Sequence, residues 1–143
     1  CAYELTVFSF FPLSQLVAPE MEKNRGGVIL TITSMAAENK NINMTSYASS
    51  KAAASHLVRN MAFDLGEKNI RVNGIAPGAI LTDALKSVIT PEIEQKMLQH
   101  TPIRRLGQPQ DIANAALFLC SPAASWVSGQ ILTVSGGGVQ ELN

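Results

Sequence analysis

The segment Val28–Ser34 restricts the fold more than any other feature, because it is apolar at nearly every position. Most of its residues are β-branched, which favours an extended backbone. A strand that does not alternate polar with apolar residues is typical of a parallel sheet that is covered on both faces. We therefore predict a strand at Val28–Ser34 that is buried on both sides of a sheet.

Two further apolar segments fit the same sheet, at Ile70–Ala76 and at Ile131–Val134. Between the first two strands, Ser46–Leu65 is rich in alanine and other helix formers. Gly66 follows it directly, and glycine commonly ends a helix. This part of the chain therefore predicts the order strand, helix, strand.

The second half of the chain adds more predicted helices. Thr82–His100 alternates charged with apolar residues, and we expect two short amphipathic helices that separate near Thr90. Pro109–Leu119 is a further helix with Asp111 in its first turn, where a carboxylate is favourable. Strands that alternate with helices predict an α/β fold with a doubly wound parallel sheet and right-handed crossovers.

The opening segment repeats apolar residues at helical spacing, with Leu5, Phe8 and Met21 among them. Pro12 falls inside this pattern, and a proline within a helix costs about 3 kcal/mol. We therefore expect a first helix that is kinked, frayed or shortened. The apolar stretch Leu5–Val17 has no basic flank and contains polar residues, so we interpret it as a helix of the domain rather than as a signal sequence or membrane span.

The composition excludes several classes of function. The 143 residues suit one domain, and eleven basic residues balance eleven acidic ones. No basic stripe is available to contact phosphates, so we predict no nucleic-acid partner and no membrane partner. Cys1 and Cys120 lie far apart in the sequence and make neither a disulfide framework nor a metal site. We accordingly predict no metal and a cytoplasmic location.

Three side chains suggest catalysis: Ser34, Tyr47 and Lys51. Tyr47 and Lys51 stand four residues apart in a predicted helix, so both project from one face. Ser34 ends a predicted parallel strand, and α/β sheets bind ligands at the carboxyl ends of their strands. A phenol is a weak base at neutral pH, but a neighbouring ammonium favours the phenolate. The three residues predict acid–base chemistry by Tyr47, with Ser34 holding the reacting oxygen.

The same residues also have an ordinary structural explanation. A tyrosine and a lysine at this spacing occur by chance in many chains, and such a tyrosine often packs while the lysine is solvated. We interpret His56 as solvated and His100 as a cation at a helix C-terminus. Trp126 is interpreted as a packing residue rather than a ligand contact.

A wider set of residues resembles the short-chain dehydrogenase/reductase family. Ser34 followed by the segment Tyr47–Lys51 is similar to the catalytic signature of that family. Arg71–Gly78 followed by Thr82 resembles its strand and loop beside the nicotinamide. Val134–Gly137 resembles its last strand. The resemblance extends through the whole chain.

The resemblance implies a role for each candidate residue. Tyr47 is implied to be the acid–base group, Lys51 to assist it and bind the nicotinamide ribose, and Ser34 to stabilise the substrate oxygen. The residues implied to contact the cofactor are Tyr47, Lys51, Ile80, Leu81 and Thr82. The residues implied to contact the substrate are Ser34, Asn39 and Tyr47.

The resemblance also implies NAD as the cofactor and hydride transfer to or from a secondary alcohol. Within the family the sequence is most similar to members that oxidise hydroxysteroids, which implies the 7α-hydroxyl of a bile acid or related steroid as the small-molecule substrate. It further implies a homo-oligomer, a tetramer in the family, and a mobile lid formed by the helices of about residues 82–100.

The sequence departs from the family at two places. The glycine-rich phosphate loop of the family is missing, so we expect residues 1–143 to form the C-terminal part of the dinucleotide-binding and catalytic domain. Thr6 stands where the family carries an asparagine that holds a water in its proton relay. The alternative to an oxidoreductase is therefore an inactive fragment that associates with homologues or aggregates.

Overall fold

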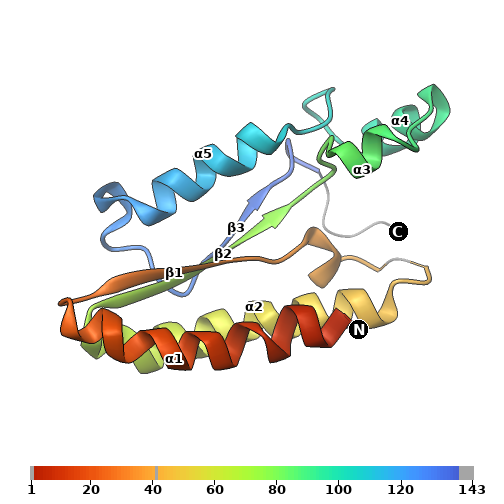
Figure 1. Ribbon diagram of the computed structural model, residues 1–143. Helices are drawn as coiled ribbons and strands as arrows, with labels where there is room; N and C mark the ends of the chain where they lie inside the picture. The colour runs from red at the N-terminus through yellow and green to blue at the C-terminus, as the bar shows by residue number, and fades with distance from the viewer. Residues whose placement is uncertain (1, 41, 139–143) are drawn as a thin grey trace.

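The computed structural model describes residues 2–40 and 42–138, so Cys1 lies outside the described residues. Its centre is a sheet of three parallel strands, β1 (Gly27–Ile32), β2 (Ile70–Pro77) and β3 (Ile131–Val134), in the order β1-β2-β3 (Figure 1). The three strands lie where the sequence predicts them. The α/β fold class with a parallel sheet is confirmed.

Helices cover both faces of this sheet. In Figure 1, α1 (Phe10–Lys23) and α2 (Thr45–Leu65) run below the sheet and α5 (Pro109–Cys120) runs above it. The predicted pair of short helices is confirmed as α3 (Asp83–Lys86) and α4 (Pro91–Leu98), which project beyond the carboxyl end of β2. The remaining elements are single helical turns: η1 (Glu4–Phe8), η2 (Met35–Ala37), η3 (Gly66–Lys68) and η4 (Pro122–Ala124).

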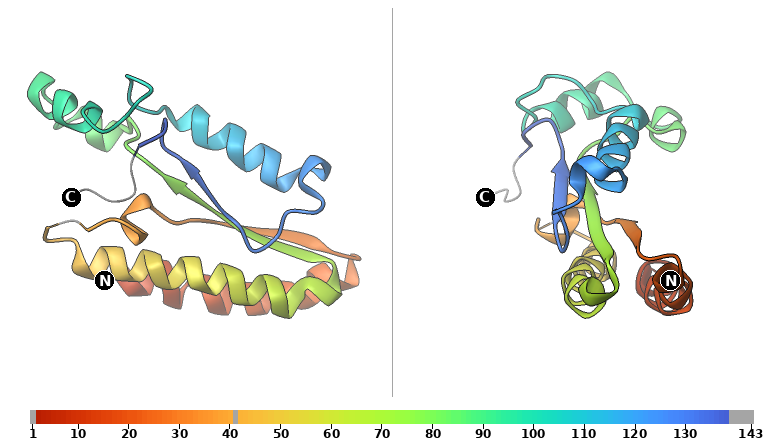
Figure 2. Two further views of the ribbon diagram at one scale, coloured as in Figure 1. Left: turned by 180° about the vertical axis from the view of Figure 1, so that it is seen from behind. Right: turned by 90° about the vertical axis from the view of Figure 1, so that its left-hand side faces the viewer.

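The main apolar core lies between the sheet and the pair α1 and α2, which run side by side in both views of Figure 2. Val58 and Met61 of α2 meet Ile70 and Val72 of β2 there, and all four side chains are buried. Burying an aliphatic side chain of this size stabilises a fold by about 1.5–3 kcal/mol. This core therefore fixes α2 against β2.

The prediction that the first strand is buried on both faces is wrong for the described chain. β1 pairs with β2 on one side, and Ile29 is its only buried residue. Ile32 is 45% exposed. The reason is position: among the described residues β1 is an edge strand that pairs with β2 on one side alone.

The opening helix is interrupted, as expected, but at Ser9 rather than at Pro12. The turn η1 is a π-helix, in which the Ser9 amide donates to the Glu4 carbonyl over 3.0 Å, and α1 begins at the next residue. Pro12 is the third residue of α1, where a backbone N–H has no partner within the helix. Pro12 therefore lies within the first turn of α1, and the interruption of the helix at Ser9 lies three residues before it. Pro19, which lies inside α1, was not anticipated.

Most of the apolar repeat of the first helix does not mark its core face, although Met21 packs against the core. Leu5, Phe8 and Leu16 are 81%, 64% and 74% exposed, whereas Ser14 and Ala18 are buried. The core side of α1 combines these two small buried residues with Phe10, Val17 and Met21, which are partly buried. A set of large apolar side chains is left on the outer side of η1 and α1.

The α-helix α2 ends at Leu65 with Gly66 as its C-cap, so the expectation that the helix stops at Gly66 is confirmed. Gly66 has an ordinary helical φ of −60°, and the left-handed residue, Asn69 with φ 57°, comes only after a turn of 3-10 helix. After α1, the amide of Gly26 donates to Met21 and that of Arg25 to Glu22, the pattern of a Schellman motif. Arg25 occupies the left-handed position with φ 66°.

The left-handed arginine generates a stability prediction. A side chain with a Cβ in this conformation costs roughly 1–2 kcal/mol, which glycine avoids. Arg25→Gly should therefore raise the free energy of unfolding by about 1 kcal/mol after glycine's greater chain entropy is deducted. The measurement is thermal and urea unfolding of the parent and the variant. Arg25→Ala is the control and should give no gain, because alanine keeps the Cβ; an equal gain from alanine would contradict the explanation.

Candidate active site

A cavity of about 470 Å³ lies at the carboxyl ends of β1 and β2. It falls within the range of about 300–1,000 Å³ that is typical of small-molecule sites. Five of the residues predicted from the sequence line it together: Ser34, Tyr47, Lys51, Ile80 and Thr82. They come from three separate parts of the chain, and the fold brings them to one place.

Tyr47 and Lys51 face each other from successive turns of α2. The Lys51 Nζ lies 5.7 Å from the centre of the Tyr47 ring, within the range of a cation–π contact. The same Nζ donates a 2.9 Å hydrogen bond to the carbonyl oxygen of Ile32, the last residue of β1. The ammonium is thus fixed between the end of the strand and the phenol, and Tyr47, which lines the cavity, is 38% exposed.

Ser34 stands two residues beyond the end of β1. Its Oγ accepts a 3.1 Å hydrogen bond from the Ala36 amide and so caps the turn η2. That bond uses a lone pair and leaves the hydroxyl proton free to point elsewhere. Ser34 can therefore donate to an oxygen in the cavity while its own position is held by the backbone.

The segment after β2 forms the third wall. The Gly78 amide donates to the Val134 carbonyl over 2.9 Å, and a Cβ on Gly78 would lie 2.8 Å from the Cβ of Ser135. Only glycine fits this close approach of two chain segments. Thr82, four residues on, lines the cavity and caps α3 by accepting a 3.2 Å hydrogen bond from the Leu85 amide.

Two predicted residues do not line this cavity. The Leu81 amide donates to the carbonyl of Gly107, so the Leu81 backbone pairs with a neighbouring loop, and Leu81 is not among the residues that line the cavity. Asn39 follows η2, and its side-chain Oδ1 is buried without a hydrogen-bond partner among the residues that the structure describes. Their contacts with cofactor and substrate stay predictions.

Four residues that line the cavity were not predicted as part of the site: Ile32 and Thr33 at the end of β1, and Pro109 and Ile112 in the first turn of α5. For Arg71 and Asn73, the sequence indicated only that they belong to a segment that resembles the family's strand beside the nicotinamide. In the structure the Arg71 guanidinium donates to the Leu119 carbonyl over 2.8 Å, and the Asn73 amide group donates to Val127 over 2.8 Å. These side chains hold the α5–β3 connection against β2.

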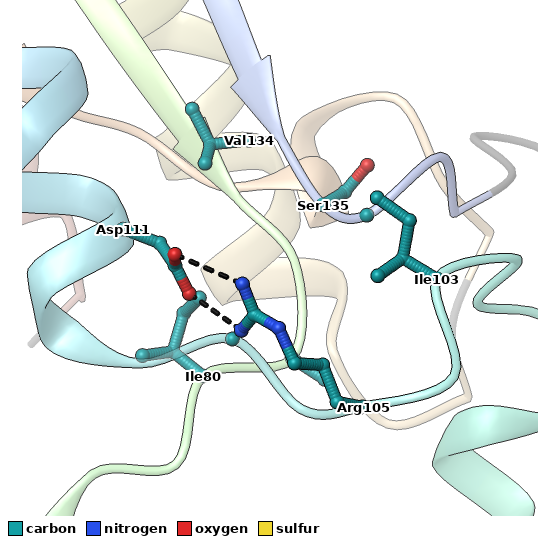
Figure 3. A pocket seen from close by; sticks show the side chains of 9 residues that line it. Ile80, Ile103, Arg105, Asp111, Val134 and Ser135 are labelled. Atoms are coloured by element: carbon teal, nitrogen blue, oxygen red, sulfur yellow. Dashed lines mark hydrogen bonds and ion pairs between the residues drawn. The ribbon is translucent and has the colours of Figure 1, made fainter.

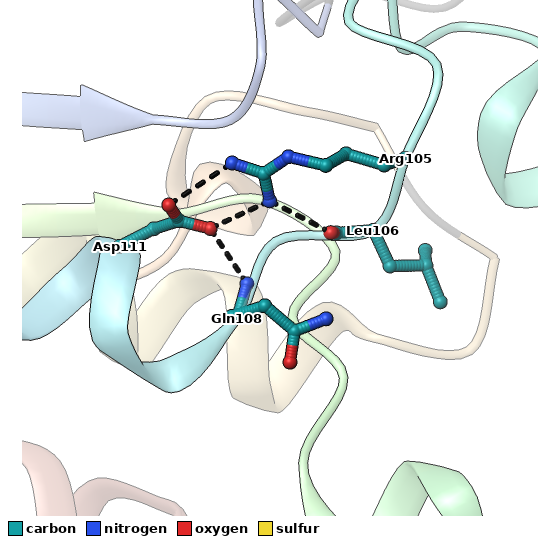
Figure 4. A network of polar contacts seen from close by, with 4 residues as sticks. All are labelled: Arg105, Leu106, Gln108 and Asp111. Atoms are coloured by element: carbon teal, nitrogen blue, oxygen red, sulfur yellow. Dashed lines mark hydrogen bonds and ion pairs between the residues drawn. The ribbon is translucent and has the colours of Figure 1, made fainter.

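A second, smaller cavity of about 220 Å³ lies on the other side of Ile80 (Figure 3). Arg105 and Asp111 project into it and form a two-pronged ion pair, with N–O distances of 2.7 and 3.0 Å. Asp111 also accepts a 2.7 Å hydrogen bond from the Gln108 amide, which completes a capping box at the start of α5 (Figure 4).

This network has a clear electrostatic effect. The hydrogen bond from Arg105, with that from the Gln108 amide and the charge of the guanidinium, lowers the pKa of Asp111 from 3.8 to about 2. The sequence signal was the placement of Asp111 at the third position of a helix that begins with proline. Its partner Arg105 was not evident from the sequence, because the pair forms across a turn.

Comparison with known proteins decides the family. The family model described as enoyl-(acyl carrier protein) reductase matches residues 1–138. A solved short-chain dehydrogenase/reductase from Mycobacterium ulcerans superimposes with a TM-score of 0.90 at 37% identity, over 94% of this chain and 50% of that one. The chain belongs to the short-chain dehydrogenase/reductase family.

Within that family, two proteins are very similar to this chain. The 7α-hydroxysteroid dehydrogenase of Escherichia coli K12 is 98% identical over 142 residues, which is 99% of this chain and 56% of the relative. A solved 7α-hydroxysteroid dehydrogenase in complex with NADH and 7-oxo glycochenodeoxycholic acid is 98% identical with a TM-score of 0.92, over 99% of this chain and 55% of that one. The chain thus spans just over half the length of these short-chain dehydrogenases.

None of the helices in the described ranges 2–40 and 42–138 is both long and apolar enough to cross a membrane.

The lowered pKa of Asp111 generates a prediction about acid stability. Because the folded pKa lies below the ordinary value of 3.8, the pair stabilises the fold fully above about pH 4 and loses that effect as the pH falls towards 2. Asp111→Asn should therefore melt below the parent at pH 6, and the two melting temperatures should converge towards pH 2.5. Arg105→Met should show the same convergence. A difference that stays constant with pH would contradict the prediction.

Proposed function

We propose that this chain carries the catalytic side of an NAD-dependent dehydrogenase that oxidises a secondary alcohol, the 7α-hydroxyl of a bile acid or related hydroxysteroid. The observation that carries the proposal is the convergence of Ser34, Tyr47 and Lys51 on one cavity, with a lysine cation held against the tyrosine ring. A phenol beside a fixed cation, in a cavity of ligand size, is an acid–base group in position to act.

In the oxidation direction, Tyr47 takes the proton of the substrate hydroxyl on its phenolic oxygen. Lys51 stabilises the phenolate that receives it, and the bond from Nζ to Ile32 keeps the ammonium in place. Ser34 donates a hydrogen bond from its hydroxyl group to the substrate oxygen, which becomes the carbonyl oxygen of the product. When bound, NAD supplies the acceptor for the hydride that leaves the carbinol carbon, and in reduction the proton returns from Tyr47.

The residues present fit one end of NAD. Ile80 and Thr82 line the same cavity as Lys51, which supports a place for the nicotinamide ring and its ribose among these three residues. A glycine-rich loop for the diphosphate does not occur in this sequence. Since the chain spans 56% of the E. coli relative, we propose that the remainder of the cofactor site comes from the part of the relative's length that this chain does not match.

The substrate class rests on the comparison. The 98% identical solved protein holds NADH with a 7-oxo bile acid, which is the product expected of oxidation at a 7α-hydroxyl. The helices α3 and α4 contain no buried residue and stand beyond the end of the sheet, which supports their role as a lid over the steroid. We further propose a cytoplasmic homo-oligomer, a tetramer as in the family.

A second candidate is a non-catalytic chain that associates through its apolar surfaces. Leu5, Phe8 and Leu16 are largely exposed on one helical segment, and β1 is an edge strand in the described chain. Exposed apolar patches and open edges both promote association. The two candidates differ in whether the chain turns over substrate when the unmatched part of the relative is supplied.

The test of catalysis uses this chain fused behind the N-terminal part of the E. coli relative that it does not match. Tyr47→Phe should lower turnover of a 7α-hydroxy bile acid by about 10²–10⁴-fold, because phenylalanine has no proton to exchange. Tyr3→Phe is the matched control and should keep the parent rate. Lys51→Met should slow turnover and move the rate maximum to higher pH, since the phenolate loses its cation. Equal rates for Tyr47→Phe and the parent would end the assignment.

The 143-residue chain by itself provides a separate prediction. It should be oligomeric or aggregated in light scattering, because its exposed apolar side chains and edge strand favour association. In calorimetry its dissociation constant for NADH should be above about 1 mM, which corresponds to a binding free energy of about −4 kcal/mol. The reason is that the chain lacks the glycine-rich loop that contacts the diphosphate. A monodisperse monomer that binds NADH in the micromolar range would show that the cofactor site is complete in this chain.

A further inference from the structure

Ile80 is shared by the two cavities described above. It lines the larger one together with Tyr47 and Lys51, and it lines the smaller one together with Arg105 and Asp111. Figure 3 shows the ion pair beside Ile80 in the smaller cavity. Arg105 and Asp111 do not line the larger cavity, so any effect they have on the reaction must pass through the wall between the two.

The wall is a short parallel pairing of two loops. The Gly107 amide donates to the Ala79 carbonyl over 2.9 Å, and the Leu81 amide donates to the Gly107 carbonyl over 2.8 Å. Ile80 and Gly107 form an isolated parallel bridge. A Cβ on Gly107 would lie 2.4 Å from the Cδ1 of Ile80, so the Ile80 side chain packs directly against the Gly107 backbone.

The ion pair fixes the Gly107 side of this pairing. Arg105 and Asp111 flank Gly107 in sequence, and their two hydrogen bonds close the turn between them. Arg105 also donates to the Leu106 carbonyl over 3.0 Å, and Asp111 accepts from the Gln108 amide (Figure 4). The turn is thereby fastened to the first turn of α5, which itself lines the larger cavity through Pro109 and Ile112.

We propose that Arg105 and Asp111 are positioning residues that set the place of the Ile80–Thr82 segment and so the affinity for the nicotinamide end of NAD. The inference rests on the proposed function. The ion pair holds the turn around Gly107 in one conformation. The hydrogen bonds of Gly107 to Ala79 and Leu81 fix the position of the Ile80–Thr82 segment relative to that turn. This segment is the part of the cavity wall that is proposed to contact the cofactor. Because neither side chain faces the larger cavity, binding of the steroid and proton transfer by Tyr47 are separate from this effect.

The experiment measures NADH affinity by fluorescence titration in the same fusion protein. Asp111→Asn should weaken NADH binding about ten-fold, the effect of losing a hydrogen bond to a charged group, and leave the KM for the alcohol unchanged. Asp111→Glu should restore the affinity, since glutamate also serves at this position of a capping box. The NADH affinity of Arg105→Lys should lie between those of the parent and Asp111→Asn, because lysine keeps the charge and loses the two-pronged geometry. Glu20→Gln, which removes a 2.6 Å ion pair on α1, is the matched control and should change nothing.

A double-mutant cycle separates positioning from general destabilisation. Ile80→Ala should itself weaken NADH binding, and Asp111→Asn should add little to that loss if it acts through Ile80. The inference would be overturned if the double variant lost NADH affinity by the product of the two single fold losses. It would also be overturned if Asp111→Asn left the NADH affinity unchanged.

Hydrogen exchange keeps the inference independent of catalysis. The Leu81 amide should exchange faster in Asp111→Asn than in the parent or in Glu20→Gln, whether or not the fusion turns over substrate. Equal exchange at Leu81 would overturn the inference even in an active enzyme. A fusion that binds NADH without turnover would overturn the proposed function alone.

Discussion

The parallel pairing of β1 with β2 is the constraint on which the rest of the structure depends. Parallel neighbours require a crossover, and here α2 crosses with Val58 and Met61 buried against β2. The crossover must start near the carboxyl end of β1, so the first turns of α2 lie beside that end. Tyr47 and Lys51 occupy those turns, and the bond from Lys51 to Ile32 joins helix to strand directly. The geometry of the candidate site is thus a consequence of strand direction before any catalytic requirement applies.

Much of this arrangement could be predicted from the sequence, because the strongest signals are local. Continuous apolar segments predicted the strands, which the structure confirms. The spacing of Tyr47 and Lys51 predicted that both lie on one face of a helix, which their contact confirms. The family and the fold class were also predicted correctly, from the residues that resemble the catalytic signature. What each site residue contributes to turnover stays a prediction.

The wrong or missing predictions concern features that need three dimensions. Apolar spacing alone does not say which side of a helix meets a sheet, and α1 buries Ser14 and Ala18 while Leu16 is exposed. The residues of β1 likewise do not indicate whether the strand lies at the centre or at the edge of its sheet. The ion pair between Arg105 and Asp111 depends on the path of a turn, and its link to Ile80 depends on a pairing between loops that lie 27 residues apart along the chain.

The capping of α3 by Thr82 ties the folding of a short helix to the chemistry of the cavity. The Thr82 oxygen accepts a hydrogen bond from the Leu85 amide when α3 is folded, which uses one of its two lone pairs. When the first turn of α3 opens, both lone pairs are available to the cavity. The number of acceptor positions at that wall therefore depends on the state of a helix of four residues. A ligand donor that takes the lone pair used by the Leu85 amide competes with the cap, so the order of α3 responds to what the cavity holds.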